Sequence, residues 1–161
     1  MIVIFEGLVG FLWVLMYCVA GIANGPHNMV FLYDQDVQDR VSQSGLISKE
    51  EIKKKYNRFM YAGILPYFIY ALICVFVING ARGFLNSFIQ LCTILLIEGV
   101  LDRLFIDWYW VNHTDAWIIP GTEDLRPYVN RKDWTGKWLG TVVGYPLIAA
   151  MICGAISLIR K

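Results

Sequence analysis

The sequence predicts an all-α, polytopic integral membrane protein folded as a bundle of four transmembrane helices. Of its 161 residues, 57% are hydrophobic and only 17% are charged, against roughly 25% charged in ordinary soluble domains. The apolar residues form four runs, each near the ~20 residues that a helix needs to cross a ~30 Å hydrocarbon core. These runs cover residues 1–23, 59–79, 84–106 and 138–159, and the second and fourth contain no charged residue.

The length suits a single membrane domain, residues 1–161. The pattern places transmembrane helices at about 1–24, 59–79, 84–110 and 138–159, with long loops at 25–58 and 111–137. The net charge is +1 and no basic stripe is present, so nucleic acid is not an expected partner. The lipid bilayer is the expected environment.

The first apolar run is expected to remain as a helix rather than to be cleaved as a signal peptide. It has no basic residues before its apolar segment, carries Glu6 there, and is longer than the 7–15 residues of a signal-peptide core. The helix should end at Asn24-Gly25-Pro26, because Gly favours the position after a helix and Pro cannot continue one. Glu6 either reaches the outer interface or carries a proton or cation.

Loop 25–58 is predicted to contain a cytoplasmic helical hairpin. A short helix starts at Asp34 or Asp36 and ends at Gly45. Ser48 and Glu51 have the spacing of a capping box, so a second helix can start there and continue into the second span. Its lysine cluster, 53–55, is most simply an anchor to anionic headgroups, and a docking surface for a partner is the alternative.

The short turn 79–83 makes the second and third helices antiparallel neighbours. The fourth helix contains many small residues, among them Gly140 and Gly144 at G-x-x-x-G spacing. Small residues at this spacing let two helices approach closely in lipid. We expect this contact within the bundle, and a contact between subunits is the alternative.

The basic residues predict the orientation of the chain in the membrane. The loops 25–58 and 111–137 contain ten Lys and Arg residues, whereas the opposite side has only Arg82, Arg160 and Lys161. Positively charged short loops stay on the cytoplasmic side. We therefore expect a protein of the plasma (cytoplasmic) membrane with both termini outside and both long loops in the cytoplasm.

The third helix becomes charged towards its predicted cytoplasmic end. Glu98 and Asp102 share a helix face, on which Tyr109 and His113 follow if the helix persists. Glu98 lies roughly 22 Å along the helix from the outer surface, still within the hydrocarbon core. A charge at the centre of a span costs about 2.5–3.5 kcal/mol, so these groups should face the bundle interior or a polar cleft. Arg103 can pair with Asp107 one turn on.

These patterns define a set of candidate site residues. Glu98 is the candidate acid or base, Asp102 a polar catalytic group and His113 a proton-transfer group. The candidate ligand-binding residues are Arg103, Asp107, Trp108, Trp110, Trp117 and Glu123. The simplest explanation of the tryptophans is an aromatic belt at the inner interface, with a stacking pocket for a ligand as the alternative, and the charges can form a closed ion-pair network. The histidines and carboxylates have no established metal-binding spacing, so no metal site is predicted, and no particular cofactor is implied.

The leading functional hypothesis is binding of a small amphipathic or lipid-like ligand in a polar cleft at the cytoplasmic end of the third helix, with acid–base chemistry as an extension. The alternative is a non-enzymatic membrane subunit or scaffold that binds a partner subunit. A third interpretation is a homo-oligomeric proton-coupled transporter or channel, because four spans are few for a single-chain carrier. No nucleotide-binding or nucleophile-elbow motif occurs in the sequence.

Overall fold

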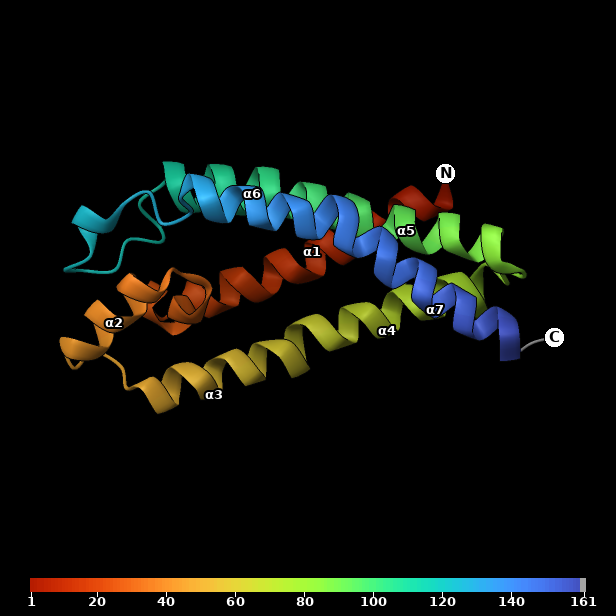
Figure 1. Cartoon of the computed structure of the whole chain (residues 1–161). Helices are drawn as coiled ribbons and strands as arrows, with labels where there is room; N and C mark the ends of the chain where they lie inside the picture. Colours follow the sequence, from red (N-terminus) through yellow and green to blue (C-terminus); the bar gives the residue numbers. More distant parts are fainter. Residues whose placement is uncertain (160–161) are drawn as a thin grey trace.

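The computed structural model describes residues 1–159, which fold into helices joined by turns and loops without a β-strand in that range. Four of its helices are long and apolar enough to cross a membrane, namely Ile2–Ile22, Lys49–Ile78, Phe84–Val111 and Arg131–Ile159. Figure 1 shows them running side by side. The N-terminus and the turn 79–83 lie at one end, called here the turn end. The longer connections lie at the opposite end, called here the loop end.

The first long helix is α1 (Ile2–Ile22), and the other three are built from consecutive segments. The second consists of α3 (Lys49–Phe59), η2 (Met60–Ile64), α4 (Leu65–Ile73) and η3 (Cys74–Ile78). The third consists of α5 (Phe84–Leu101) and η4 (Asp102–Val111). The fourth consists of α6 (Arg131–Leu139), η6 (Gly140–Gly144) and α7 (Tyr145–Ile159).

The η2, η3, η4 and η6 segments have the wider turns of a π-helix. Two of them come just before Pro66 and Pro146. A proline has no backbone N–H and its ring collides with the preceding turn of an α-helix, so a wider turn there relieves both problems. The helices therefore pass their prolines without breaking.

Side-chain caps explain why two long helices begin before their apolar runs. The predicted capping box is confirmed: Ser48 Oγ accepts from the Glu51 amide at 3.2 Å, and Glu51 Oε2 accepts from the Ser48 amide at 3.0 Å. The helix continues from there through the lysine cluster into the second span, as predicted. The fourth helix begins at Arg131 rather than at residue 138, because Asn130 Oδ1 accepts from the amides of Lys132 and Asp133.

Glycines set the close contacts between helices. A Cβ added at Gly7 of α1 would lie 2.8 Å from Ile97 Cβ of α5. A Cβ added at Gly99 of α5 would lie 2.6 Å from the Tyr145 ring and 2.8 Å from Thr141 Cγ2. Both positions thus require glycine for the observed approach of α1 and of the fourth helix to α5.

The expected contact of Gly140 and Gly144 within the bundle is not formed. Apart from the neighbouring residues and backbone of its own helix, no described atom lies within 4 Å of a Cβ added at either glycine. The fourth helix instead packs on α5 through a stripe that repeats every four residues and includes buried Thr141, Ala149 and Cys153. The two glycines lie beside this stripe.

The connections at the loop end pack into a folded cap. Loop one forms η1 (Pro26–Leu32) and α2 (Gln35–Gln43), and η5 (Glu123–Leu125) forms in the loop after the third helix. The two loops meet where the Tyr33 hydroxyl donates to the Trp117 carbonyl at 2.6 Å. Their apolar side chains form one buried cluster with the loop-end parts of the long helices, including Val30, Val37, Val41 and Ile119.

Candidate functional site

A partly buried cluster of charges links η4 to α6. The Arg103 guanidinium pairs with Asp102 and also with Asp107, whose Oδ2 is 2.5 Å from Arg103 Nη1. Lys137 Nζ of α6 donates to Asp107 Oδ1 at 2.8 Å. The Arg103 and Asp102 side chains are only 14% and 13% exposed. The predicted pairing of Arg103 with Asp107 is therefore confirmed.

Glu98 lies one turn before this cluster and differs from it. It is 4% exposed, and its Oε2 accepts a hydrogen bond of 3.4 Å from the Tyr145 hydroxyl at the start of α7. Within residues 1–159, no basic nitrogen lies within the 4.0 Å of an ion pair to its carboxylate. Glu98 is thus a buried carboxyl group bonded to a hydroxyl and not to a cation.

These groups line one side of a cavity of about 300 Å³ at the loop-end half of the bundle. We call this cavity the polar cleft. Its polar side is formed by Glu98, Asp102, Arg103, Asp107, Lys137 and Tyr145. The remaining wall is largely apolar and includes Val14, Cys18, Phe59, Ile64 and Ile106. A cavity with one charged side and one apolar side suits a ligand that is itself amphipathic.

Aromatic residues of the two loops close the polar cleft at the loop end. Tyr33, Trp117 and Tyr128 all line it. Tyr33 stacks edge-on against Tyr128 at 4.9 Å between ring centroids, and Trp117 packs edge-on against Trp110 at 5.2 Å. Burial raises the pKa of Tyr33, so its hydroxyl stays protonated and holds Trp117 in place through the carbonyl bond.

Two N–H groups of the residues that line the cleft have no hydrogen-bond partner. Arg103 Nε and Trp117 Nε1 are both buried and unpaired. An unpaired buried donor costs roughly 1–3 kcal/mol, so native proteins rarely keep one without a reason. Both groups are donors, and a ligand that reached them would need acceptor oxygens. Asp107 Oδ2 also has no hydrogen bond, although it forms an ion pair with Arg103.

Several residues predicted to belong to the site lie outside the cleft. Trp108 is 51% exposed, and His113 is exposed and bonds through Nδ1 to the Trp108 carbonyl at 2.6 Å. Glu123 is exposed on the cap, where it accepts from the Gly121 amide. Trp110 lies behind Trp117. His113 does not continue the face of Glu98 because the wider turns of η4 rotate the residues that follow Asp102 away from a four-residue repeat.

The structure adds residues that sequence reasoning missed. In the sequence, Lys137 belongs to a basic segment whose only predicted role was to set the membrane orientation. Tyr145 lies inside an uncharged apolar run. The position of Tyr145 could have been noticed, because a tyrosine hydroxyl within a transmembrane helix needs a hydrogen-bond partner. Tyr33 and Tyr128 reach the cleft only through the fold of the loops, which the sequence pattern does not reveal.

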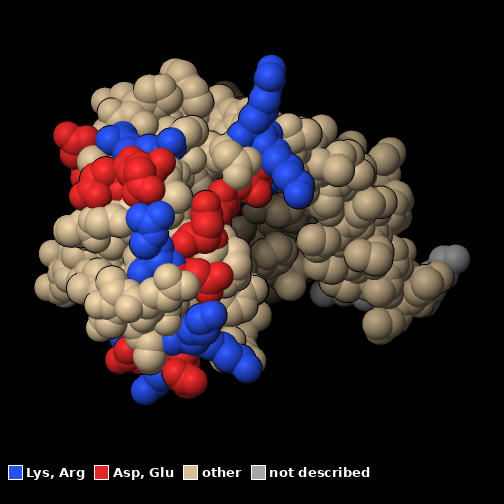
Figure 2. Space-filling model, turned by 60° about the vertical axis from the view of Figure 1, so that its left-hand side comes forward, with Lys and Arg blue, Asp and Glu red and all other residues tan. Residues whose placement is uncertain are grey.

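Charged side chains gather at the loop end of the molecule. Figure 2 shows acidic and basic side chains interleaved there, beside a hollow, while the rest of the visible face carries few charges. Among the described residues, no group of three or more His, Cys, Asp and Glu side chains is placed to hold a metal ion. Comparisons of the chain with protein-family models, with curated proteins and with solved structures find no match.

Proposed function

We propose that the polar cleft binds one small amphipathic or lipid-like molecule taken from the membrane. The observation that carries this proposal is the division of a single buried cavity into an ionic side and an apolar side. The unpaired donors of Arg103 and Trp117 support it, because they match a ligand with acceptor oxygens such as hydroxyl, carbonyl or ester groups.

The residues of the cleft have distinct roles in this proposal. The terminal nitrogens of Arg103 form ion pairs with Asp102 and Asp107, and its Nε donates to the ligand. Glu98 is the proton acceptor or donor, because it is buried and has a hydroxyl partner in place of a cation. Acid–base chemistry on a bound ligand is the extension of the binding function. His113 and Glu123 receive no role, since both are exposed outside the cleft.

The test compares what the protein retains during purification. Wild-type protein in mild detergent should carry about one extractable small molecule per chain, detected by native mass spectrometry and identified after denaturation. Glu98→Gln should lower this occupancy at least tenfold. Glu50→Gln on the exposed surface of α3 is the matched control and should leave it unchanged. Equal occupancy in wild type and Glu98→Gln would contradict the proposal.

A second candidate function is a structural membrane subunit. The bridge from Asp102 through Arg103 and Asp107 to Lys137 ties η4 to α6 without any ligand, as a scaffold requires. In that case the charges stabilise the bundle and the surfaces outside the cleft bind partners. Removal of one member of the ion-pair bridge should strongly destabilise a structural network, whereas a change in a functional site may be neutral for stability.

We also propose that the chain lies in the plasma membrane with the loop end in the cytoplasm and both termini outside. The support is the excess of Lys and Arg in the two long connections. The polar cleft then lies in the cytoplasmic half of the bilayer.

A further inference from the structure

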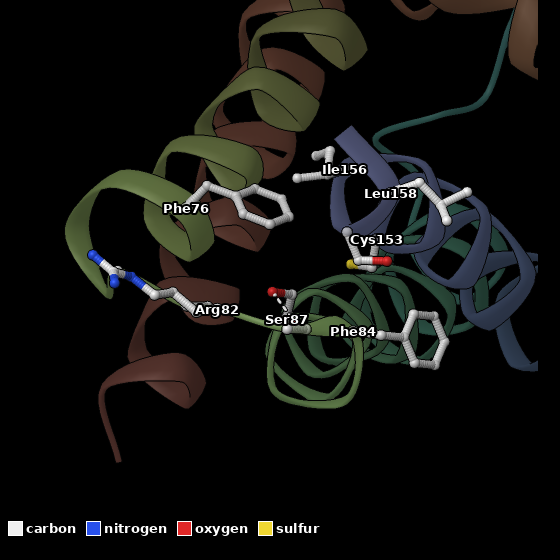
Figure 3. Close-up of a pocket in the computed structure, with 11 residues that line it drawn as sticks. Phe76, Arg82, Phe84, Ser87, Cys153, Ile156 and Leu158 are labelled. Carbon is white, nitrogen blue, oxygen red and sulfur yellow. Dashed lines mark hydrogen bonds between the residues drawn. The ribbon is translucent and has the colours of Figure 1, made fainter. Parts of the chain in front are cut away.

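A second cavity, of about 870 Å³, lies at the turn end, far along the bundle from the polar cleft. It is bounded by η3, the turn 80–83, the first turn of α5 and the end of α7. Figure 3 shows Phe76 of η3 on one side of it, Ile156 and Cys153 of α7 across from Phe76, and Ser87 of α5 below them. Nothing in the proposed function uses this cavity.

One exposed basic side chain, Arg82, lies beside this cavity. Figure 3 shows it extending from the turn away from Ser87 and Cys153. α5 also begins beside this cavity, after Gly83, without a side-chain cap, so its first amide groups add partial positive charge. No acidic residue is among the described residues that line the cavity.

An apolar groove continues from the cavity towards the middle of the bundle. It measures about 410 Å³ and shares Phe76 and Ile156 with the cavity. All of its described lining residues are apolar, and they come from α4, η3 and α7. From Val77 back to Ile69 the helix covers roughly 12 Å, close to the ~15 Å half-thickness of a hydrocarbon core.

We propose that the cavity and groove together bind a phospholipid with a net negative headgroup. One acyl chain lies in the groove between α4 and α7, and the phosphate lies at the mouth beside Arg82 and the start of α5. A helix start and a guanidinium both favour a phosphate. A monoanionic lipid such as phosphatidylglycerol fits better than phosphatidylcholine, because none of the cavity-lining residues within 1–159 has a carboxylate to receive a cationic headgroup.

The experiment uses full-length protein with phosphatidylglycerol that carries a photoreactive diazirine near the end of one acyl chain. After illumination, mass spectrometry of the digest should place cross-links on the groove residues, around Ile73 and Ile156. The yield at these positions should be about fivefold higher than with the matching phosphatidylcholine probe, the effect expected of one basic residue near an anionic headgroup. Arg82→Gln should remove this preference.

Two variants serve as controls. Arg131→Gln removes an exposed basic residue at the loop end and should leave the preference intact. Ile73→Trp places a large ring in the groove at a half-exposed position and should lower the yield from both probes. Equal yields from the two lipids, a preference that survives Arg82→Gln, or cross-links between two chains across the groove would each overturn the proposal. These outcomes leave the polar cleft at the other end unaffected.

Discussion

One carboxyl group joins the two connections of the loop end. Asp34 Oδ2 accepts a hydrogen bond of 2.7 Å from Asn130 Nδ2, the residue that caps α6. Burial, and next the neighbouring Asp133 carboxyl, raise the pKa of Asp34 to about 6, and Asp36 adds to the rise. The Asn130 bond acts in the opposite direction without cancelling it. The folded protein therefore holds a proton at Asp34 that the unfolded chain releases more easily.

This raised pKa predicts a stability that falls as the pH rises. Since the ordinary pKa is 3.8 and the folded one about 6, the loss develops between these two values and is complete above about pH 6. The apparent melting temperature should be higher at pH 5 than at pH 7.5, by at most about 2–4 °C because Asp34 is only partly buried. Circular dichroism of the detergent-solubilised protein measures it.

Asp34→Asn should remove this part of the pH dependence while it keeps an acceptor for Asn130. Asp124→Asn is the control, because the Arg40 side chain holds the pKa of exposed Asp124 below its ordinary value. The Asp124→Asn variant should still have a higher melting temperature at pH 5 than at pH 7.5. An identical pH profile in Asp34→Asn and wild type would show that the raised pKa does not contribute.

At the scale of elements, the third helix carries two kinds of buried charge within two turns. The η4 charges are paired with one another and with Lys137 of α6, so they fasten two elements together. Glu98 at the end of α5 has only the Tyr145 hydroxyl as its partner. Paired charges are typical of structural links, and a buried carboxyl group without a cation is typical of a functional one.

This contrast predicts opposite effects on stability. Arg103→Met leaves Asp102 without its partner and should lower the free energy of unfolding by about 3–5 kcal/mol. Glu98→Gln removes a buried charge and keeps the bond to Tyr145, so it should be neutral or stabilising. Unfolding of both variants in the same detergent gives the comparison. If Glu98→Gln destabilises the protein as much as Arg103→Met does, Glu98 belongs to the structural network. That result would favour a structural membrane subunit over ligand binding in the cleft.

Long elements were predictable from the sequence, whereas contacts between elements were not. The four helices follow from runs of apolar residues, and the Ser48 capping box is a local signal. The Glu98 and Arg103 part of the cleft follows from charges inside an apolar helix. Its other half depends on contacts such as Tyr33 with Trp117, which lie 84 residues apart and leave no periodic pattern. Because η4 has wider turns than an α-helix, the four-residue spacing from Glu98 does not place His113 on the same face.

At the scale of the whole molecule, polar and apolar surfaces are separated along the bundle. Charges are concentrated at the loop end (Figure 2), where the folded cap covers the polar cleft. Among the described residues of the turn end, Arg82 is exposed and Glu6 is buried. The two cavities therefore lie in opposite halves of a membrane that contains the four helices. The orientation decides which leaflet each cavity meets, so it determines which lipids each can reach.

The predicted orientation can be tested with single cysteines. Three of the native cysteines are buried, Cys92 is partly buried within α5, and none is exposed, so all should react slowly. In intact cells a membrane-impermeant maleimide should label Asn86→Cys, exposed at the turn end, within minutes. It should label Gln43→Cys, exposed on the cap, only after the cells are permeabilised. The native cysteines without either substitution give the background. Labelling of Gln43→Cys in intact cells, with protection of Asn86→Cys, would reverse the orientation and move the polar cleft to the outer leaflet.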